Sequence, residues 1–430
     1  MGNPVTENTK RAAAFCGSAF FPMAQLQKKE ECDTIFSKTA GKEAFAMKKQ
    51  KDPILSARRD AAEAYARKLC TLLWRTDKDL IYTIEKDTAP KDSVENKRFY
   101  LCAGQLYSGL AYSYNAGSLA SWLDLAGEPD EDGVYTITGL NWKALSGLSS
   151  TARLGIDCSS AVIRSWQSIG ARIAAHATDS MTLQNGFLPV GQYKAPADEY
   201  VDTIRDCAEN GEQVMYRAYA LLQKADAIVM KKPASGHTRL VSRVEVIRTV
   251  SGAINGEASF VYCHEQCANY KMRLQSEEFT EDLSPFCRTD RVYSFKTLYE
   301  TGYLPITVRE LVDPSPIAPA EAADSVQDPT AENLLEGTIT SNRGLDAVTV
   351  TISATEGQVV QSCTARPWRS RTEDFAFRMA QFVEDGPERL LGSLDLRALQ
   401  EGTYRCTVTA RAVSGEVFTV RDFEFRGPIG

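Results

Sequence analysis

The stretch Asp157-Cys158-Ser159-Ser160 decides the fold that this sequence predicts, because it places a cysteine where a helix begins. Apolar residues recur at helical spacing directly behind it, at Ala161, Val162, Trp166 and Ile169. Asp157 and Ser159 both belong to residue types that cap the first turn of a helix. Backbone N–H groups and the positive end of the helix dipole favour a thiolate at such a position. Cys158 is therefore the candidate nucleophile.

The histidines supply the candidate base. The chain has three, His176, His237 and His264. His237 directly precedes residues 238–241, a run that is typical of a strand. A cysteine at a helix start followed along the chain by a histidine at a strand start is the order found in papain-like thiol enzymes. We therefore expect Cys158 and His237 to act together, and His176, which lies outside every motif, to be a surface residue.

These segments resemble the NlpC-type cysteine peptidases, a papain-like family with Asp-Cys-Ser-Gly at the helix start and Gly-His at the strand start. The family also carries Gly-x-Pro-Tyr before the cysteine and a Gly-Asp-hydrophobic strand before the histidine. The matching segments, within residues 55–310, are Asp157-Cys158-Ser159, Gly236-His237, Gly109-Leu110-Ala111-Tyr112 and Asp226-Ala227-Ile228-Val229-Met230. Ser160 and Ala111 replace the family's glycine and proline. Arg239 stands where a small residue is common, on the strand face that also carries His237.

The resemblance implies a fold and an activity. The fold class is α+β, with a papain-like catalytic domain in which the helix bearing Cys158 packs on an antiparallel sheet. The activity is that of a cysteine peptidase or amidohydrolase, without a cofactor, acting on a peptide amide in the stem peptides of bacterial peptidoglycan. The same scaffold also hosts acyltransferases and amidases. The alternative from another class is a catalytically silent papain-like domain that serves as a binding or adhesion protein.

A third group is needed to hold the far nitrogen of His237 and fix its tautomer. In the resembling family it is a His, Asn or Gln on the next strand, which here corresponds to residues 260–266. Alternation places His264 and Gln266 on one face of that strand. His264 is our first candidate for the third group, and Gln266 and Glu265 are the alternatives.

The oxyanion of an acyl intermediate needs hydrogen-bond donors aimed at the attacked carbonyl. The backbone N–H of Cys158 is the natural donor. The resemblance adds Tyr112 as a hydroxyl that lines the site, with a packed core tyrosine as the other interpretation. We also place Ser159 among the residues that line the substrate or oxyanion region.

A metal site is the competing interpretation for one group of residues, Cys263, His264, Cys267 and Cys287. Their spacing lacks the second close pair of a structural zinc site, and adjacent residues of a strand point to opposite faces. We predict no metal. Glycine-rich phosphate loops of the known patterns are absent from the sequence, so we expect no nucleotide cofactor either.

Composition is that of a globular protein, with 43% hydrophobic and 24% charged residues in 430. A formal net charge of -7 argues against a nucleic-acid partner. No run approaches the roughly 18 apolar residues of a membrane span. No signal peptide is visible, although removal of a leader would leave the same sequence, and the resemblance implies a bacterial secreted or cell-envelope protein. A cytoplasmic location stays open, and the odd number of 11 cysteines does not settle the compartment.

The chain divides into four predicted segments. Residues 1–50 form an N-terminal extension that is helical or partly mobile, and residues 51–312 form the catalytic domain. Within the latter we expect helices over residues 56–74 and 201–224, then strands at 225–230, 238–248 and 259–264. Residues 313–334 are rich in proline, alanine and acidic residues and predict an extended linker. Residues 335–430 show the period-two alternation of short strands and predict an all-β sandwich.

The predicted sandwich resembles an immunoglobulin-like domain at one point. Tyr404 lies two residues before Cys406, as does the tyrosine-corner residue of such domains. Trp368 is too close to Cys363 for the full immunoglobulin pattern. We expect residues 335–430 to bind cell-wall material or a protein partner.

Overall fold

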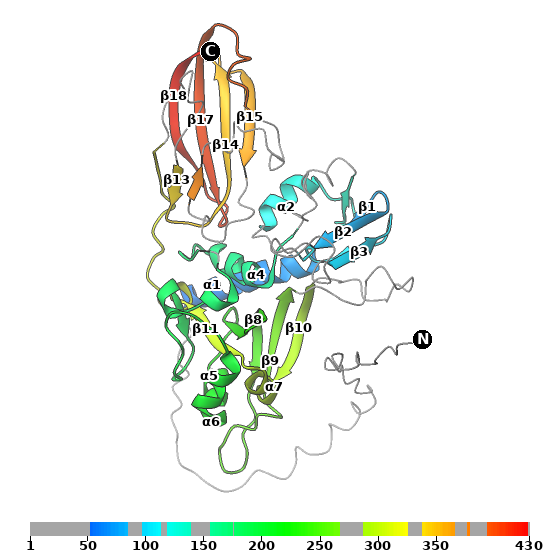
Figure 1. Ribbon diagram of the computed structural model, residues 1–430, viewed down its shortest axis with the longest axis vertical. Helices are drawn as coiled ribbons and strands as arrows, with labels where there is room; N and C mark the ends of the chain where they lie inside the picture. Colours follow the sequence, from blue (N-terminus) through cyan, green and yellow to red (C-terminus); the bar gives the residue numbers. More distant parts are fainter. Residues whose placement is uncertain are drawn as a thin grey trace, which may run out of the picture. The chain divides into compact units, whose positions relative to one another are not determined.

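A computed structural model describes the chain in nine stretches: residues 52–84, 97–112, 118–138, 155–174, 176–266, 287–325, 338–365, 376–378 and 394–428. It is a mixed α+β structure with several antiparallel sheets and few helices (Figure 1). The chain divides into two units, Met1–Gln50 and Lys51–Gly430. The first unit lies outside the described residues, so the predicted N-terminal extension stays a prediction.

The largest sheet has six strands in the order β10-β9-β8-β7-β11-β6, and all its neighbouring pairs are antiparallel. Its strands are β6 (Phe187–Pro189), β7 (Ala227–Lys232), β8 (Ser235–Glu245), β9 (Phe260–Gln266), β10 (Cys287–Ser294) and β11 (Leu304–Val308). The three strands predicted from alternation correspond to β7, β8 and β9. A tight turn joins β7 to β8, and a one-to-one register pairs Met230 with His237.

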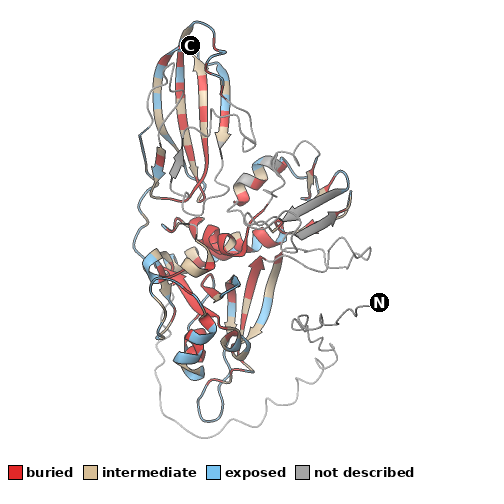
Figure 2. Cartoon of the chain, viewed as in Figure 1, coloured by how far each residue is buried: buried red, intermediate tan, exposed pale blue. Residues whose placement is uncertain are grey.

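Two helices cover this sheet and share its core. Helix α1 (Pro53–Thr71) begins with Pro53 in its first turn and with Asp52 as its cap, whose carboxylate accepts from the N–H groups of Ile54 and Leu55. Helix α4 (Cys158–Gln167) contacts α1, β8 and β9. Both helices turn a buried face to the core (Figure 2). The core residues that they share with the sheet include Ala62, Ala66, Val162, Ile163, Trp166, Leu240 and Val241.

The helix predicted over residues 201–224 is broken into two. Helix α5 (Thr203–Asn210) ends and α6 (Glu212–Tyr219) begins at Gly211. Gly211 has a φ of 82°, which a glycine adopts without the steric cost that a side chain would add. A third short helix, α7 (Phe295–Thr301), follows β10 and packs on α5 and α6.

A second, smaller core forms around the segment before Cys158. Its three-stranded sheet has the order β4-β1-β5, and helix α2 and the pair β2–β3 accompany it. The elements are β1 (Leu73–Thr76), β2 (Leu80–Ile84), β3 (Lys97–Leu101), β4 (Tyr107–Ser108), α2 (Leu119–Ala126) and β5 (Tyr135–Ile137). Trp74 is fully buried at its centre, and its indole donates to the carbonyl oxygen of Gly109. This core therefore fixes the chain just before Tyr112.

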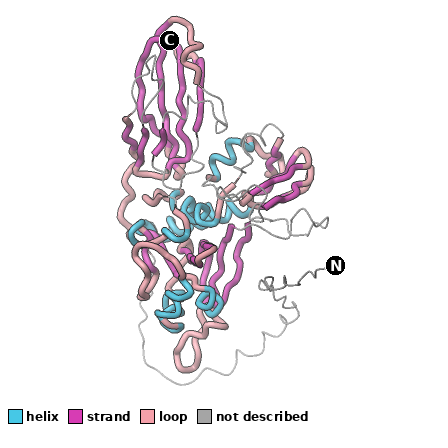
Figure 3. The backbone as a smooth tube through the Cα atoms, in the orientation of Figure 1, coloured by secondary structure: helices cyan, strands magenta, loops and turns pink. Residues whose placement is uncertain are grey.

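The C-terminal part consists of antiparallel sheets (Figure 3). One has the order β12-β13-β16 and the other β15-β14-β17-β18. Their strands are β12 (Ala322–Asp324), β13 (Thr338–Ser341), β14 (Leu345–Ala354), β15 (Val359–Ala365), β16 (Ala376–Arg378), β17 (Gly402–Ala412) and β18 (Val417–Gly427). Ile339 of the first sheet shares a core with Val348, Val350 and Ile352 of the second. The hydroxyl of Tyr404 donates to the carbonyl oxygen of Gln400 at 3.0 Å, as in a tyrosine corner.

Part of the predicted linker forms a strand. Residues 322–324 form strand β12 and pair with residues 339–341 of β13, because extended backbone beside a sheet edge can complete its hydrogen bonds there. Residues 326–334 of the predicted linker lie outside the described residues. Contacts also join α2 to the C-terminal strands, where the guanidinium of Arg411 lies 2.5 Å from the carboxylate of Asp124. Among the described helices, none is long and apolar enough to cross a membrane.

Candidate active site

The first turn of α4 holds Cys158 as the sequence predicts. Asp157 is its cap: the extended backbone of Asp157 leads into the helix, and its Oδ1 accepts from the N–H of Ser160 at 2.7 Å. Ser159 is 2% exposed, and its hydroxyl donates to the same Oδ1 at 3.0 Å. The hydroxyl of Ser159 therefore supports the cap, and the assignment of Ser159 to the substrate or oxyanion region stays a prediction. Cys158 itself is 6% exposed.

The chain enters this turn beside the Gly109–Tyr112 segment. The N–H of Ile156 donates to the carbonyl oxygen of Ala111 at 3.1 Å, and Tyr112 and Ile156 form an isolated parallel bridge. Gly155 has a φ of 123°, and a Cβ there would lie 1.8 Å from the carbonyl oxygen of Ala111. Only glycine fits so close an approach. Tyr112 thus lies beside Ile156, which precedes Cys158 by two residues along the chain. The side chain of Tyr112 packs against the smaller core.

Strand β8 carries His237 to the cysteine. Gly236 precedes it at a place without room for a side chain, since a Cβ there would lie 1.8 Å from Oγ1 of Thr178. The pKa of His237 is raised above its ordinary value. Burial alone lowers it, but the neighbouring Cys158 thiol and Glu265 carboxylate outweigh the burial. The Cys158 thiol therefore lies close enough to His237 to change the pKa of its ring.

Glu265 on β9 is the second polar residue beside His237. Its Oε2 lies 3.7 Å from Nε2 of His237, accepts from Nε of Arg239 at 2.6 Å and accepts from the Tyr293 hydroxyl at 2.8 Å. Only 4% of the Glu265 side chain is exposed. Burial alone raises the pKa of Glu265, yet the nearby His237 and the charge of the hydrogen-bonded Arg239 bring it well below its usual range. Glu265 is therefore an ionised carboxylate next to His237.

Arg239 lies on the same face as His237, as the alternation predicts. Its guanidinium carbon lies 4.1 Å from the ring centre of Tyr293 and 4.5 Å from that of Tyr303. Two aromatic faces around one guanidinium hold it in place by cation–π attraction. Burial together with the neighbouring Glu265 carboxylate raises the pKa of Tyr293 to about 12 despite the charge of Arg239, so the ring stays a neutral hydrogen-bond donor.

His264, our first candidate for the third group, lies elsewhere. Its Nε2 is 2.8 Å from Oε1 of Glu63 on α1, and its Nδ1 has no hydrogen-bond partner among the described residues. Burial lowers the pKa of His264, and the hydrogen bond with Glu63 opposes this only in part. Adjacent residues of a strand point to opposite faces, and the register that pairs Leu240 with His264 puts Glu265 beside Arg239. The geometry thus corrects the assignment from His264 to Glu265.

Gln266, the other alternative, faces away from His237 as well. Its Nε2 donates to the carbonyl oxygen of Leu110 at 2.6 Å, and its Oε1 accepts from the thiol of Cys287. Gln266 therefore ties β9 to the segment that precedes Tyr112. Alternation correctly places Gln266 and His264 together, but we chose the wrong face. Arg239 was the missed signal, because a cation beside the base on a buried strand needs a carboxylate partner.

The residues of the competing zinc interpretation do not form a metal site in the part of the chain that is described. No group of three or more His, Cys, Asp or Glu there is arranged to hold a metal ion, and Cys267 lies outside it. His176 is half-buried, with its ring 5.9 Å from that of Phe187, where we expected a surface residue. Burial lowers the pKa of His176. The candidate catalytic side chains among the described residues therefore lie on β8, on β9 and at the start of α4.

A thiol at a helix start, an imidazole and an ionised carboxylate in series can generate and hold a nucleophilic thiolate. The imidazole takes the thiol proton, and the carboxylate fixes the tautomer and stabilises the resulting imidazolium. Cys158, His237 and Glu265 have this order and these environments. No family model, curated protein or solved structure matches this chain.

Proposed function

We propose that this protein is a cysteine amidohydrolase that cleaves a peptide amide, with Cys158 as nucleophile, His237 as general base and acid, and Glu265 as the residue that orients His237. One observation carries the proposal: His237 lies beside the Cys158 thiol, which raises its pKa, and 3.7 Å from the buried Glu265 carboxylate. Since Nε2 of His237 faces Glu265, Nδ1 is the nitrogen that serves the thiol.

The reaction proceeds through a thioester. His237 takes the proton of Cys158, and the thiolate sulfur attacks the amide carbon, whose oxygen becomes an oxyanion near the backbone N–H of Cys158. His237 then gives its proton to the amide nitrogen, the C–N bond breaks and the amine leaves. Water, deprotonated by His237, attacks the thioester carbon. The carboxylic acid leaves, and the proton returns to the thiol of Cys158.

Arg239 is a positioning residue in this scheme. It keeps Glu265 ionised and in place through the 2.6 Å hydrogen bond, while Tyr293 and Tyr303 hold its guanidinium. Its positive charge also lowers the pKa of His237 and so counteracts the effects of Cys158 and Glu265 on that ring. Arg239 therefore prevents the imidazolium from becoming too weak an acid to protonate the leaving amine.

The papain-like fold and the substrate class belong to the same proposal. Helix α4 with Cys158 at its start packs on an antiparallel sheet that carries His237, and the Gly109–Tyr112 segment lies beside the cysteine, as the resemblance to NlpC-type peptidases implies. That resemblance alone supplies peptidoglycan stem peptides as substrate and a bacterial cell envelope as location. The tyrosine corner at Tyr404 supports an immunoglobulin-like sandwich that binds cell-wall material or a protein partner.

The test is covalent labelling combined with turnover of peptidoglycan fragments. Brief treatment with iodoacetamide near neutral pH should label Cys158 before the other ten cysteines, as read by peptide mass mapping. Cys158→Ala should lose turnover while its circular dichroism spectrum stays unchanged. Cys102, which is more exposed than Cys158, provides the control as Cys102→Ala, which should keep its activity. Preferred labelling of another thiol, or an active Cys158→Ala variant, would falsify the assignment.

A second candidate function is a binding protein without turnover. The observation that favours it is the low exposure of the pair, 6% for Cys158 and 19% for the His237 side chain. In that case peptidoglycan fragments bind equally well to the wild type and to Cys158→Ala, and no released amine accumulates. Quantifying new amino groups after long incubation distinguishes the two functions.

A further inference from the structure

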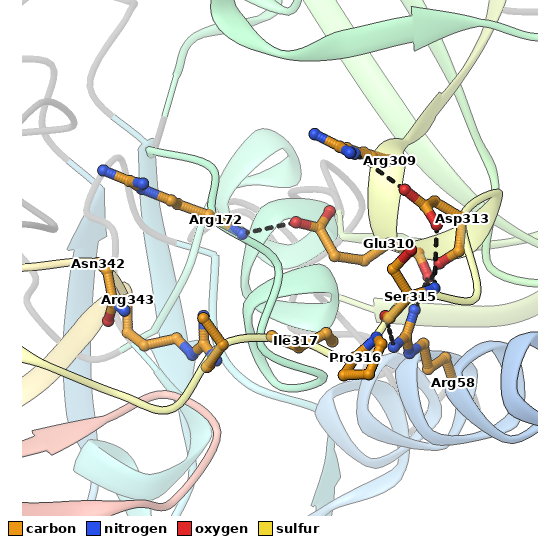
Figure 4. Close-up of a pocket in the computed structure, with 11 residues that line it drawn as sticks. Arg58, Arg172, Arg309, Glu310, Asp313, Ser315, Pro316, Ile317, Asn342 and Arg343 are labelled. Atoms are coloured by element: carbon orange, nitrogen blue, oxygen red, sulfur yellow. Dashed lines mark hydrogen bonds and ion pairs between the residues drawn. The ribbon is translucent and has the colours of Figure 1, made fainter.

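A cavity of about 280 Å³ lies apart from the candidate active site, where residues 313–318 run between α1 and the turn that joins β13 to β14 (Figure 4). Helix α1 supplies Arg58, the loop after α4 supplies Arg172, and the short helix η4 (Arg309–Leu311) supplies two residues. The charged residues that line it are Arg58, Arg172, Arg309, Arg343, Glu310 and Asp313. Arginine thus dominates the lining.

Two of these arginines build the walls. Arg58 donates to the backbone carbonyl oxygens of Glu310, Asp313 and Ser315 at 3.0, 2.7 and 2.6 Å. Arg343 donates through Nη2 to the carbonyl oxygen of Ala318. The side chain of Asn342 extends this wall by donating to the carbonyl oxygen of Pro319 at 2.8 Å. The guanidinium groups therefore hold the backbone around the cavity in one conformation.

The carboxylates of the lining do not neutralise its arginines. Four guanidinium groups face two carboxylates. Asp313 pairs with Arg309 at 3.2 Å, and the Arg309 side chain is 77% exposed. Glu310 accepts from the backbone N–H of Arg172 at 3.2 Å, which uses the carboxylate without engaging the guanidinium of that residue. The cavity keeps an excess of positive charge.

Two guanidinium groups of the lining have N–H groups without a hydrogen-bond acceptor among the described residues. The exposed side chain of Arg172 makes no hydrogen bond or ion pair with any residue that the structure describes. Arg343 is different, because its side chain is only 6% exposed. Its buried Nε finds no hydrogen-bond acceptor within the described stretches and lies 3.7 Å from the carboxylate of Glu416. The guanidinium charge of Arg343 therefore meets no carboxylate at hydrogen-bond distance among the described residues.

We infer that this cavity binds a small, multiply charged oxyanion, of phosphate or polycarboxylate type. Guanidinium groups present paired N–H donors that match phosphate and carboxylate oxygens, and Arg172 and Arg343 carry two of the four guanidinium charges of the lining. The volume lies at the lower end of small-molecule sites, which favours a compact ligand over a polymer. Bound there, the anion would connect the loop after α4 to the turn between β13 and β14.

The test uses the full chain and two compact probes, inorganic pyrophosphate and citrate, in isothermal titration calorimetry at low ionic strength. At least one of them should bind saturably with one site per chain and should raise the unfolding temperature. Acetate, with a single charge, should do neither at equal concentration. The affinity should fall as salt is added, because the attraction is between charges.

Substitutions locate the site. Arg172→Gln should weaken binding about tenfold by removing one charge-assisted contact. Arg343→Gln should weaken it at least as much, and its unfolding curve without ligand shows whether it folds. Arg217→Gln provides the matched control, since Arg217 is an exposed arginine of α6 outside the cavity. Unchanged affinity in Arg172→Gln, equal losses in Arg217→Gln, or no saturable binding of either probe would each overturn the inference.

Discussion

Strand β9 places two polar clusters on its opposite faces, and they differ in what they surround. On one face Glu265 holds His237 and Arg239 next to Cys158. On the other face His264 pairs with Glu63 of α1, and its Nδ1 has no hydrogen-bond partner among the described residues. Each cluster is a histidine with a carboxylate. The comparison teaches that a histidine–carboxylate pair indicates catalysis only when the imidazole also lies beside a reactive group such as a thiol.

The largest expected effect separates the two faces by activity. Glu265→Gln should lower kcat/KM by about 10²–10⁴-fold, because the base loses its orienting charge. His264→Gln, the matched variant on the other face, should change kcat/KM by less than about threefold, because its side chain lies away from the thiol. Steady-state kinetics on folded protein measures both. A larger loss at His264 would restore it as the third group.

The second expected effect is on stability against pH. The raised pKa of His237 means that its contribution to folding is complete below about pH 6.5 and is lost as the pH rises through the folded-state pKa. The lowered pKa of His264 works in the opposite direction, so its contribution is complete above about pH 6.5 and is lost as the pH falls through the folded-state pKa.

Urea unfolding between pH 5 and 9 for His237→Gln and His264→Gln measures this contrast. Relative to wild type, His264→Gln should lose less stability on acidification, and His237→Gln should lose less on the alkaline side. Two variants with the same pH dependence would mean that the two histidines have equivalent environments, contrary to the comparison.

The smallest expected effect concerns Arg239. Its charge lowers the pKa of His237, so Arg239→Gln should move the alkaline limb of kcat/KM to higher pH. Arg239→Lys keeps the charge and should move that limb less. The full pH profile distinguishes this electrostatic role from a loss of packing, which would lower the whole profile without shifting it.

Local sequence signals were sufficient for the helix start at Cys158 and the strand start at His237, because capping and alternation act over a few residues. The third group was not predictable in this way. Which face of β9 meets His237 depends on the β8–β9 register, and the register is set by packing across the sheet. The strand β12 escaped for a related reason, since it depends on pairing with the distant strand β13. The break at Gly211 is a local feature, because it lies at a glycine with a φ of 82°. The cavity lined by Arg58 and Arg343 joins positions that the sequence separates widely.

The bridge between Tyr112 and Ile156 has a consequence for how this protein can vary. The N–H of Ile156 donates to the carbonyl oxygen of Ala111, so the two sides of the bridge are joined two residues before the thiol. Of the described residues between the two sides, α2 and β5 belong to the smaller core, whereas the turn at residues 127–133 is exposed and can change in composition without displacing Cys158. Residue 155 has no such freedom, because any side chain there would collide with the carbonyl oxygen of Ala111.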